Sequence, residues 1–76
     1  MQIKIFSTPT CSYCVTLKTF LKEKGFDFQD IDVSKDQTAL EEMVKKSNQM
    51  GVPVIDIDGQ IIVGFDKGRI EKALKI

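Results

Sequence analysis

The sequence predicts a small α/β protein whose elements follow the order β-α-β-α-β-β-α. Apolar and polar residues alternate in short runs near the N-terminus, as in half-buried strands, and three longer segments repeat apolar residues at helical spacing. The dipeptide Asp58-Gly59 joins two β-branched runs, which is a strong hairpin signal. A length of 76 residues allows one small core, so we expect a single domain over residues 1–76.

The first strand and the first helix are predicted from adjacent patterns. Residues 2–7 alternate until Phe6, which indicates a strand, and a turn containing Pro9 follows. The next segment predicts a helix over about residues 12–24, which ends at Gly25. Its apolar stripe consists of Cys14, Leu17, Phe20 and Leu21.

The middle of the chain predicts an edge strand and a second helix. Apolar and polar residues mix over residues 26–31, so we expect a strand with one exposed side at the edge of a sheet. Either Ser34 or Asp36 is expected to cap the following helix, which should end near Asn48. The apolar positions of this helix are Leu40, Met43 and Val44.

The last third predicts a hairpin followed by a short helix. After a turn at residues 50–53, strands are expected over residues 54–57 and 61–63. Asp66 is expected to cap the final helix. The apolar residues of that helix are Ile70, Ala73 and Leu74.

Charge and composition exclude several classes of partner. Eleven basic and eleven acidic residues cancel and are interspersed, so nothing favours binding to nucleic acid or to an anionic membrane. No apolar stretch has the length of a membrane span, and no signal peptide is visible. We therefore expect a cytoplasmic protein without nucleic-acid or membrane partners. Histidine is absent, so a thiolate would need activation by the backbone and a helix.

Cys11 and Cys14 are the only two cysteines, and they lie where the first strand gives way to the first helix. The (i, i+3) spacing places both on one helix face, and the helix start stabilises a thiolate, so Cys11 is the expected nucleophile. This pattern predicts a redox dithiol. A structural zinc site would need ligands from two chains, and two inert core thiols are the remaining alternative.

Three segments carry a resemblance to a known family. Cys11-Ser12-Tyr13-Cys14, Val52-Pro53 and Gly64-Phe65-Asp66 resemble, in order and spacing, the motifs of glutaredoxins, and the resemblance covers nearly the whole chain. It implies a minimal thioredoxin fold with a four-stranded mixed sheet in the order 2-1-3-4 and three flanking helices. It also implies that the three segments meet at one end of this sheet.

The resemblance further implies a binding site around the cysteines. Its residues for substrate or glutathione would be Tyr13, Gln49, Val52, Pro53, Gly64, Phe65 and Asp66. The Val52-Pro53 bond is expected to be cis, and the backbone of Val52 would pair with an extended substrate. Gly64 and Asp66 would hold the γ-glutamyl end of glutathione. Gln49 would bind the glycyl carboxylate.

The sequence also differs from the family pattern at five positions. Thr8 replaces a lysine, Met50 and Gly51 replace arginine and threonine, Val63 replaces the first glycine of a pair, and Ser12 replaces a proline. Two cations that would meet the carboxylates of glutathione are therefore missing. We expect weak glutathione binding, because charge-assisted hydrogen bonds are stronger than neutral ones.

Together these features predict a glutaredoxin-like disulfide reductase. The Cys11 thiolate would attack a disulfide, and Cys14 would resolve the mixed disulfide. Electrons would come from glutathione or from a flavin-dependent thioredoxin reductase, with no bound cofactor or metal, and the protein would act as a monomer on disulfide-containing proteins. Two alternatives are a dimer that binds a [2Fe-2S] cluster with glutathione, and a redox-regulated adaptor without turnover.

Overall fold

The fold is described here from a computed structural model that covers residues 1–76. Its elements, in chain order, are β1 (Ile3–Ser7), α1 (Ser12–Glu23), β2 (Gln29–Asp32), α2 (Gln37–Ser47), β3 (Val54–Ile57), β4 (Gln60–Val63) and α3 (Lys67–Leu74). This is the order predicted from the sequence. None of the three helices is long and apolar enough to span a membrane.

The four strands form one mixed sheet in the order β2-β1-β3-β4. β1 runs parallel to β2 and antiparallel to β3, and β4 returns antiparallel to β3. The sheet order 2-1-3-4 and the edge position of β2 are both confirmed. Central β1 therefore delivers the chain to the start of α1 at the same end of the sheet where β3 begins.

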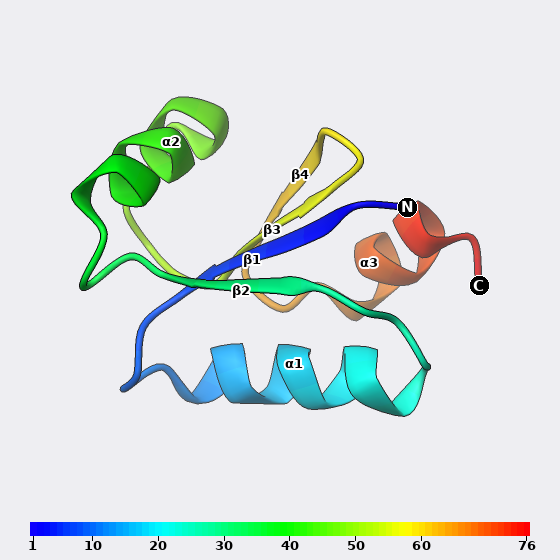
Figure 1. Cartoon of the computed structure of the whole chain (residues 1–76). Coiled ribbons are helices and arrows are strands. Elements are labelled where there is room, and N and C mark those ends of the chain that lie inside the picture. Colours follow the sequence, from blue (N-terminus) through cyan, green and yellow to red (C-terminus); the bar gives the residue numbers. More distant parts are fainter.

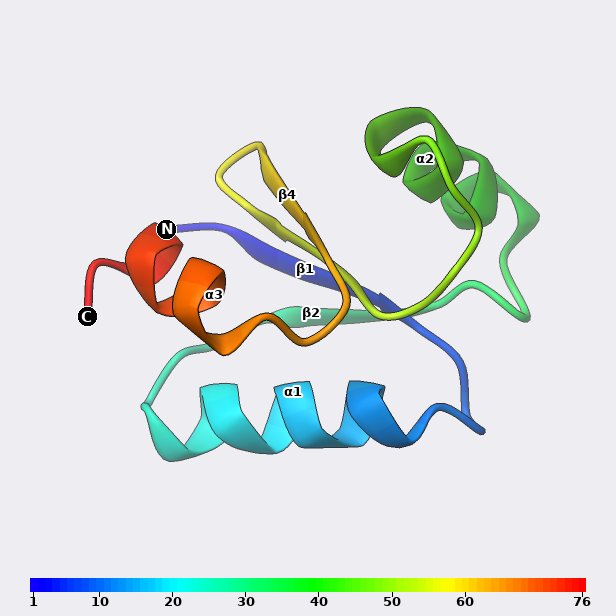
Figure 2. The ribbon, with the colours of Figure 1, turned by 180° about the vertical axis from the view of Figure 1, so that it is seen from behind.

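The helices cover the two faces of the sheet unequally. Figure 1 shows α1 on one side of the strands and α2 on the other, and Figure 2 shows the same layers from behind. α1 and α3 enclose a core of nine buried residues, which are Ile3, Ile5, Leu17, Leu21, Ile55, Ile57, Ile62, Ile70 and Leu74. α2 covers a smaller core that consists of Phe6, Val33, Ala39, Met43 and Val54.

Strand alternation assigns the side chains of β1 to these two cores. Ile3 and Ile5 pack toward α1, whereas Phe6 packs toward α2. Because side chains two residues apart share a face, Ser7 at the end of β1 faces α1. This position matters for the site, since Ser7 is buried with only 2% of its surface exposed.

Each helix begins at a side-chain cap. The caps are Cys11 for α1, Asp36 for α2 and Asp66 for α3. Of the two residues expected to cap α2, the structure uses Asp36, whose Oδ1 accepts a hydrogen bond from the Ala39 N–H at 3.0 Å. α2 then ends at Asn48, which adopts the left-handed conformation at φ 58°.

Element bounds differ from the sequence-based ones mainly in β2. A strand was expected over residues 26–31, but the ladder with β1 begins at the pair Lys4 and Gln29 and continues to Asp32. Phe26 and Phe28 instead lie before the strand and pack against the α1-side core. Shifts of one residue occur at the starts of β1 and β4 and at the end of α1.

The β3–β4 hairpin turns as its sequence predicts. Asp58 and Gly59 both have positive φ, at 51° and 91°, which is the conformation that favours Asn-Gly and Asp-Gly in two-residue hairpins. The Asp58 carboxylate also accepts a hydrogen bond from the Gln2 N–H at 2.7 Å. The turn thereby holds the N-terminus beside the hairpin.

Candidate functional site

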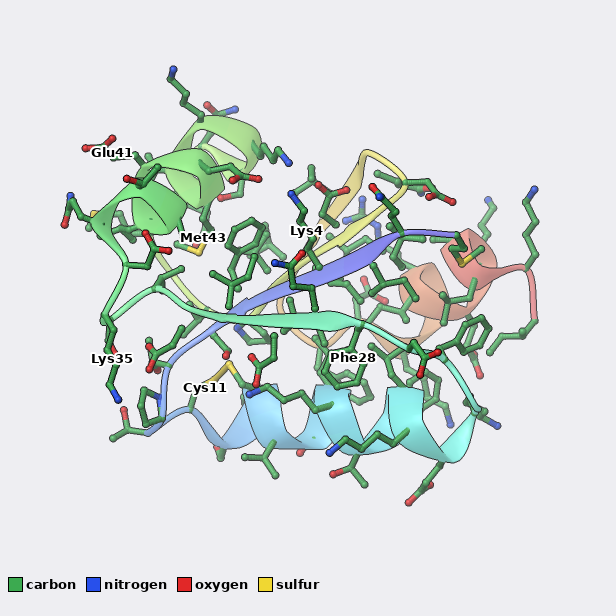
Figure 3. The ribbon with its side chains drawn as sticks, viewed as in Figure 1. Lys4, Cys11, Phe28, Lys35, Glu41 and Met43 are labelled. Atoms are coloured by element: carbon green, nitrogen blue, oxygen red, sulfur yellow. A yellow bond between two sulfur atoms is a disulfide. The ribbon has the colours of Figure 1, made fainter.

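The Cys11–Cys14 disulfide lies at the N-terminal end of α1, and its sulfurs face the sheet side of the helix (Figure 3). The two Cα atoms are 5.2 Å apart. Cys11 is the N-cap, and its Sγ accepts a hydrogen bond from the Cys14 N–H at 3.1 Å. Cys11 is half-buried, whereas Cys14 is completely buried. An incoming disulfide therefore has access to Cys11 and not to Cys14.

The start of α1 favours a negative charge on Cys11. First-turn N–H groups of a helix lack intrahelical acceptors and carry the positive end of the dipole. No acidic residue occupies the first turn of α1, so no carboxylate opposes this field. The N–H that bonds the Cys11 sulfur would bond the thiolate more strongly, because the acceptor would then carry charge.

Pro53 belongs to the same end of the sheet as the cysteines. The Val52-Pro53 peptide bond is cis, which confirms the prediction for this bond. Phe6 pairs with Val54, so Pro53 lies opposite Ser7 at the end of β1. Alternation from Ile55 and Ile57 places Pro53 on the α1 face. Pro53 is fully buried there, beneath the start of α1.

The Gly64-Phe65-Asp66 segment is joined directly to this position. The Gly64 N–H donates to the Pro53 carbonyl at 2.8 Å, and the positive φ of Gly64, 79°, turns the chain out of β4. Asp66 caps α3 by accepting from the Arg69 N–H at 3.2 Å. Phe65 packs edge-on against Phe20, with ring centroids 5.7 Å apart. Its side chain is thus part of the packing of α1, while its backbone remains at the site.

Gln49 uses its side chain to close its own loop. Its Nε2 donates to the Gly51 carbonyl at 3.0 Å and to Ser47 Oγ at 3.1 Å, and its Oε1 accepts from the Gly51 N–H at 2.6 Å. A Cβ on Gly51 would lie 2.8 Å from that Oε1, so a larger residue there would displace the Gln49 side chain from this position. Gln49 therefore supports the loop that leads to Val52, and its amide is occupied rather than free for a carboxylate.

We use the term rim for three exposed apolar side chains that are close in sequence to the cysteines and to Val52-Pro53. Tyr13 and Val15 on the first turn of α1 expose 66% and 59% of their surfaces, and Met50 exposes 70%. Val52 is half-buried and packs against the smaller core under α2. Large apolar side chains of this kind are enriched where proteins contact one another. No cation occupies the positions of Thr8 and Met50.

Sequence reasoning missed a polar cluster beside the disulfide. Ser7 Oγ donates to Asp30 Oδ1 at 2.8 Å, and Lys18 Nζ pairs with Asp30 Oδ2 at 2.8 Å. The three residues come from β1, β2 and α1, and they are more than ten positions apart in the chain. The only signal in the sequence was Lys18 one helical turn beyond Cys14.

The next carboxylate along β2, that of Asp32, bonds Ser34 just beyond the strand. Asp32 Oδ1 accepts from both the N–H and the hydroxyl of Ser34, at 2.9 and 2.5 Å. The bond from the Ser34 hydroxyl is the largest cause that lowers the pKa of Asp32 below its ordinary value. Burial opposes it, and the bond from the Ser34 N–H and the charges of Lys35 and Lys18 lower the pKa further. Strand alternation places Asp32 on the same α1 face as Asp30, since the two pair with Ser7 and Ile5 of β1.

Comparison with known proteins identifies the family. The family model for glutaredoxin matches residues 3–62. A glutaredoxin-like 8.6 kDa protein from the rubredoxin operon of Clostridium pasteurianum is 53% identical over 97% of this chain and 99% of its own length. Glutaredoxin 3 of Escherichia coli K12 is 39% identical over 86% of this chain and 78% of its own length.

A solved structure agrees with this assignment. The glutaredoxin-like protein NrdH-redoxin from Escherichia coli superposes with a TM-score of 0.86 at 26% identity, over 95% of this chain and 93% of that one. The Cys-x-x-Cys pair at the start of α1 is the chemical feature that thiol–disulfide exchange requires. The chain therefore belongs to the glutaredoxin family of thiol–disulfide oxidoreductases.

Proposed function

We propose that the protein reduces disulfides in protein substrates through Cys11 and Cys14. The Cys11 thiolate attacks one substrate sulfur, the substrate disulfide breaks, and a mixed disulfide forms at Cys11. Cys14 then loses its proton and attacks Cys11 Sγ, which releases the second substrate thiolate. The substrate gains two electrons, and the enzyme ends with its Cys11–Cys14 bond.

The observation that carries this proposal is the difference between the two cysteines. Cys11 caps α1 and is partly exposed, while Cys14 is buried one turn inside the helix. A nucleophile needs access and a stabilised thiolate, whereas a resolving thiol only has to reach the neighbouring sulfur. The Cα separation of 5.2 Å supports that second step, since it lies within the range of unstrained disulfides.

The rim favours proteins over glutathione as substrates. Thr8 and Met50 offer no charge to the two carboxylates of glutathione, and the amide of Gln49 is bonded within its own loop. The exposed side chains of Tyr13, Val15 and Met50 would instead contact the apolar surface around a protein disulfide. The backbone of Val52 would pair with an extended segment of that substrate.

For the electron donor we infer a flavin-dependent thioredoxin reductase. The E. coli NrdH-redoxin has a thioredoxin-like activity profile, and this chain resembles that protein over almost its full length. A protein donor would use the same apolar rim as a protein substrate. Glutathione would use contacts that this chain lacks.

A coupled assay tests the proposal. Oxidised protein is supplied with NADPH and thioredoxin reductase in one reaction, and with NADPH, glutathione and glutathione reductase in another, with insulin as the disulfide substrate. We expect steady turnover in the first reaction and at least about tenfold slower turnover in the second. Absence of turnover with both donors would contradict disulfide reductase activity, and faster turnover with glutathione would reverse the assignment of the donor.

A further inference from the structure

A bonded polar cluster closes the α1 face of the sheet at the disulfide end. Lys18 Nζ lies 2.8 Å from Asp30 Oδ2, and Asp30 Oδ1 accepts a hydrogen bond from the hydroxyl of buried Ser7 at 2.8 Å. The Lys18 side chain is only 23% exposed, unlike most surface lysines, while that of Asp30 is 46% exposed. Three elements thus hold one ammonium group in a defined place.

Helix geometry places this ammonium over the turn that contains Cys14. Lys18 is four residues beyond Cys14, so the two Cβ atoms are neighbours on one helix face, about 6 Å apart. Helical side chains lean toward the N-terminus and cover the preceding turn. The strand partner of Lys18 agrees with this direction, because Asp30 is bonded to Ser7 at the end of β1, where α1 begins.

Few other charges face Cys14. On α1 the charged residue nearest to Cys14 at helical spacing is Lys18. β2 contributes Asp30 and Asp32 on the same face, and Asp32 also accepts two hydrogen bonds from Ser34. β1 and the start of β3 contribute uncharged Ser7 and Pro53. Asp66, at the start of α3, accepts a hydrogen bond from the Arg69 N–H as the cap of that helix. Lys35, beyond the end of β2, adds a positive charge near Asp32, and Lys18 is the only cation of α1 within about one turn of Cys14.

Cys14 needs such a cation in only one step of the exchange. A fully buried thiol resists ionisation, because burial disfavours the charged form. Resolution of the mixed disulfide nevertheless requires its thiolate. An ammonium has three donors, so Lys18 can bond Asp30 with one and still present others toward the sulfur. Both oxygens of Asp30 have partners, because Ser7 Oγ bonds Oδ1 and Lys18 Nζ bonds Oδ2.

We propose that Lys18, held by Asp30 and Ser7, is a positioning residue that stabilises the Cys14 thiolate during resolution. This role rests on the proposed function, since it concerns its second step. The Cys14 thiol gives its proton to water, and the thiolate attacks Cys11 Sγ. The bond between Cys11 and the substrate sulfur breaks, and the departing substrate thiolate takes up a proton.

The test titrates Cys14 alone, in the Cys11→Ser variant, by the ultraviolet absorbance of the thiolate. Lys18→Met is expected to raise the measured pKa of Cys14 by at least about one unit, as loss of a nearby opposite charge does. Lys18→Arg keeps the charge and should restore most of the shift. Lys22→Met, one turn further along α1 and exposed, is the matched control and should leave the pKa unchanged.

A merely structural role for Lys18 would give a different result. In that case Lys18→Met would lower the midpoint of thermal unfolding without changing the pKa of Cys14, and the proposal would be overturned. Equal shifts of this pKa in Lys18→Met and Lys22→Met would also overturn it. If Lys18→Met fails to fold, Lys18→Gln provides the same comparison. The titration involves no disulfide substrate, so its failure is distinguishable from a failure of the coupled assay.

Discussion

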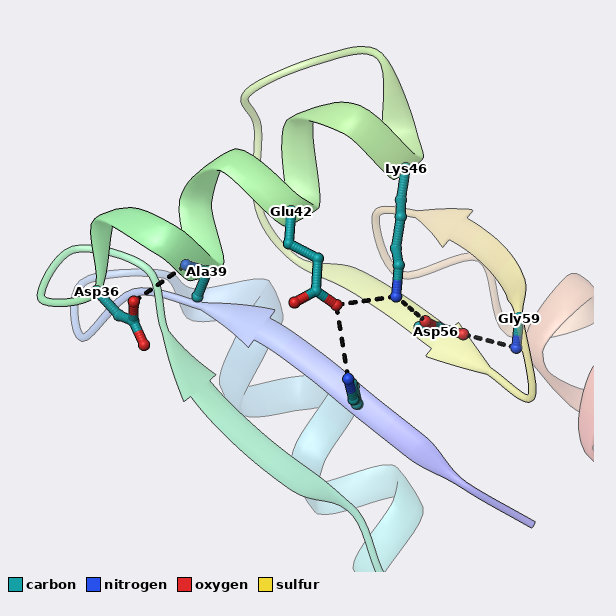
Figure 4. A network of polar contacts seen from close by, with 7 residues as sticks. Asp36, Ala39, Glu42, Lys46, Asp56 and Gly59 are labelled. Carbon is teal, nitrogen blue, oxygen red and sulfur yellow. Dashed lines mark hydrogen bonds and ion pairs between the residues drawn. The ribbon is translucent and has the colours of Figure 1, made fainter.

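The two faces of the sheet are stabilised by different means. On the α1 face, nine buried apolar residues from all the strands except β2 and from two helices form the larger core. On the α2 face, five buried residues form a smaller core, and an ionic network extends it. Lys46 on α2 bonds Glu42 at 2.9 Å and Asp56 on β3 at 2.8 Å, while Lys4 on β1 lies 3.5 Å from Glu42 (Figure 4).

The residues that react belong to one face of the sheet, whereas the other face only stabilises the fold. The cysteines, Pro53 and the Lys18 cluster belong to the α1 face, where apolar packing holds α1 rigidly against β1 and β3. α2 contributes no reacting group, and charge partly fixes its position. Changes on the α1 face should therefore affect exchange chemistry and global stability, whereas changes on the α2 face should affect stability and its dependence on pH.

The largest expected effect comes from the cysteines themselves. Cys11→Ser should reduce disulfide exchange by roughly a thousandfold or more, because it removes the nucleophile. Cys14→Ser should still attack a substrate but should accumulate the mixed disulfide at Cys11. Mass spectrometry after reaction with a disulfide peptide distinguishes the two variants. Adduct formation at Cys14 in the Cys11→Ser protein would reverse the assigned roles.

The second effect compares the two cores. Leu17→Ala on α1 empties a fully buried site and should lower the free energy of unfolding by about 2–5 kcal/mol. Leu40→Ala on α2 removes a half-buried side chain and should cost about 1 kcal/mol. Urea denaturation followed by circular dichroism measures both. Equal losses of unfolding free energy in Leu17→Ala and Leu40→Ala would show that the two faces depend equally on apolar packing.

The third effect concerns the ionic network. Lys46→Met should cost about 1–3 kcal/mol in urea denaturation, because the nearly buried Asp56 carboxylate would keep its bond from the Gly59 N–H but lose its charged partner. Lys45→Met is the control, because the ammonium group of Lys45, next to Lys46 in the chain, makes no ion pair. This change should alter the free energy of unfolding by less than about 0.5 kcal/mol. Similar values for the two variants would mean that the network contributes nothing specific.

How far the sequence predicts this molecule depends on the range of the interactions. The hairpin at Asp58-Gly59 and the caps at Asp36 and Asp66 depend on residues close in the chain, so local patterns identify them. The start of β2 depends on where its ladder with β1 begins, at Lys4 and Gln29, and alternation at Phe26 and Phe28 does not contain that information.

The same distinction applies to the site. Cys11 and Cys14 are recognisable because their spacing and helix-start position are local, and family resemblance supplied the cis bond before Pro53. The loop-closing bonds of Gln49 and the Lys18–Asp30 pair were not predicted. The first depends on a particular rotamer, and the second on tertiary contacts between three elements.

A fourth effect is expected where the two faces meet, in the loops before α1 and after α2. The double change Thr8→Lys plus Met50→Arg restores cations at both family positions, and each charge-assisted bond is worth roughly 1.5–3 kcal/mol. We expect the Michaelis constant for a glutathionylated peptide to fall by about tenfold or more, with smaller change in maximal turnover. An unmodified protein that already saturates at low substrate, together with no effect of the double change, would refute weak glutathione binding.

The smallest effect is the pH dependence of the α2 face. A bond from the Lys46 side chain, aided by the charges of Lys46 and Lys4, lowers the pKa of Glu42 below its ordinary 4.5. Bonds to Asp56 and then to Glu42 raise the pKa of Lys46 above its ordinary 10.5. Glu42 therefore stabilises the fold above pH 4.5 and loses this contribution as the pH falls through its folded pKa. Lys46 contributes fully below pH 10.5 and loses its contribution as the pH rises through its folded pKa.

Thermal unfolding as a function of pH measures this dependence. The midpoint of Lys46→Met should lie below that of the unmodified protein between about pH 5 and 10, and the difference should narrow at both extremes. The part due to the partly exposed pair with Glu42 should not exceed about 8 °C, because such pairs contribute up to about 1 kcal/mol. Some acid sensitivity should persist in the variant, since Lys4 still lies 3.5 Å from Glu42. A difference that stays constant from pH 3 to 11 would attribute the effect of Lys46 to packing of its aliphatic stem, and the contrast between a charged and an apolar face would then disappear.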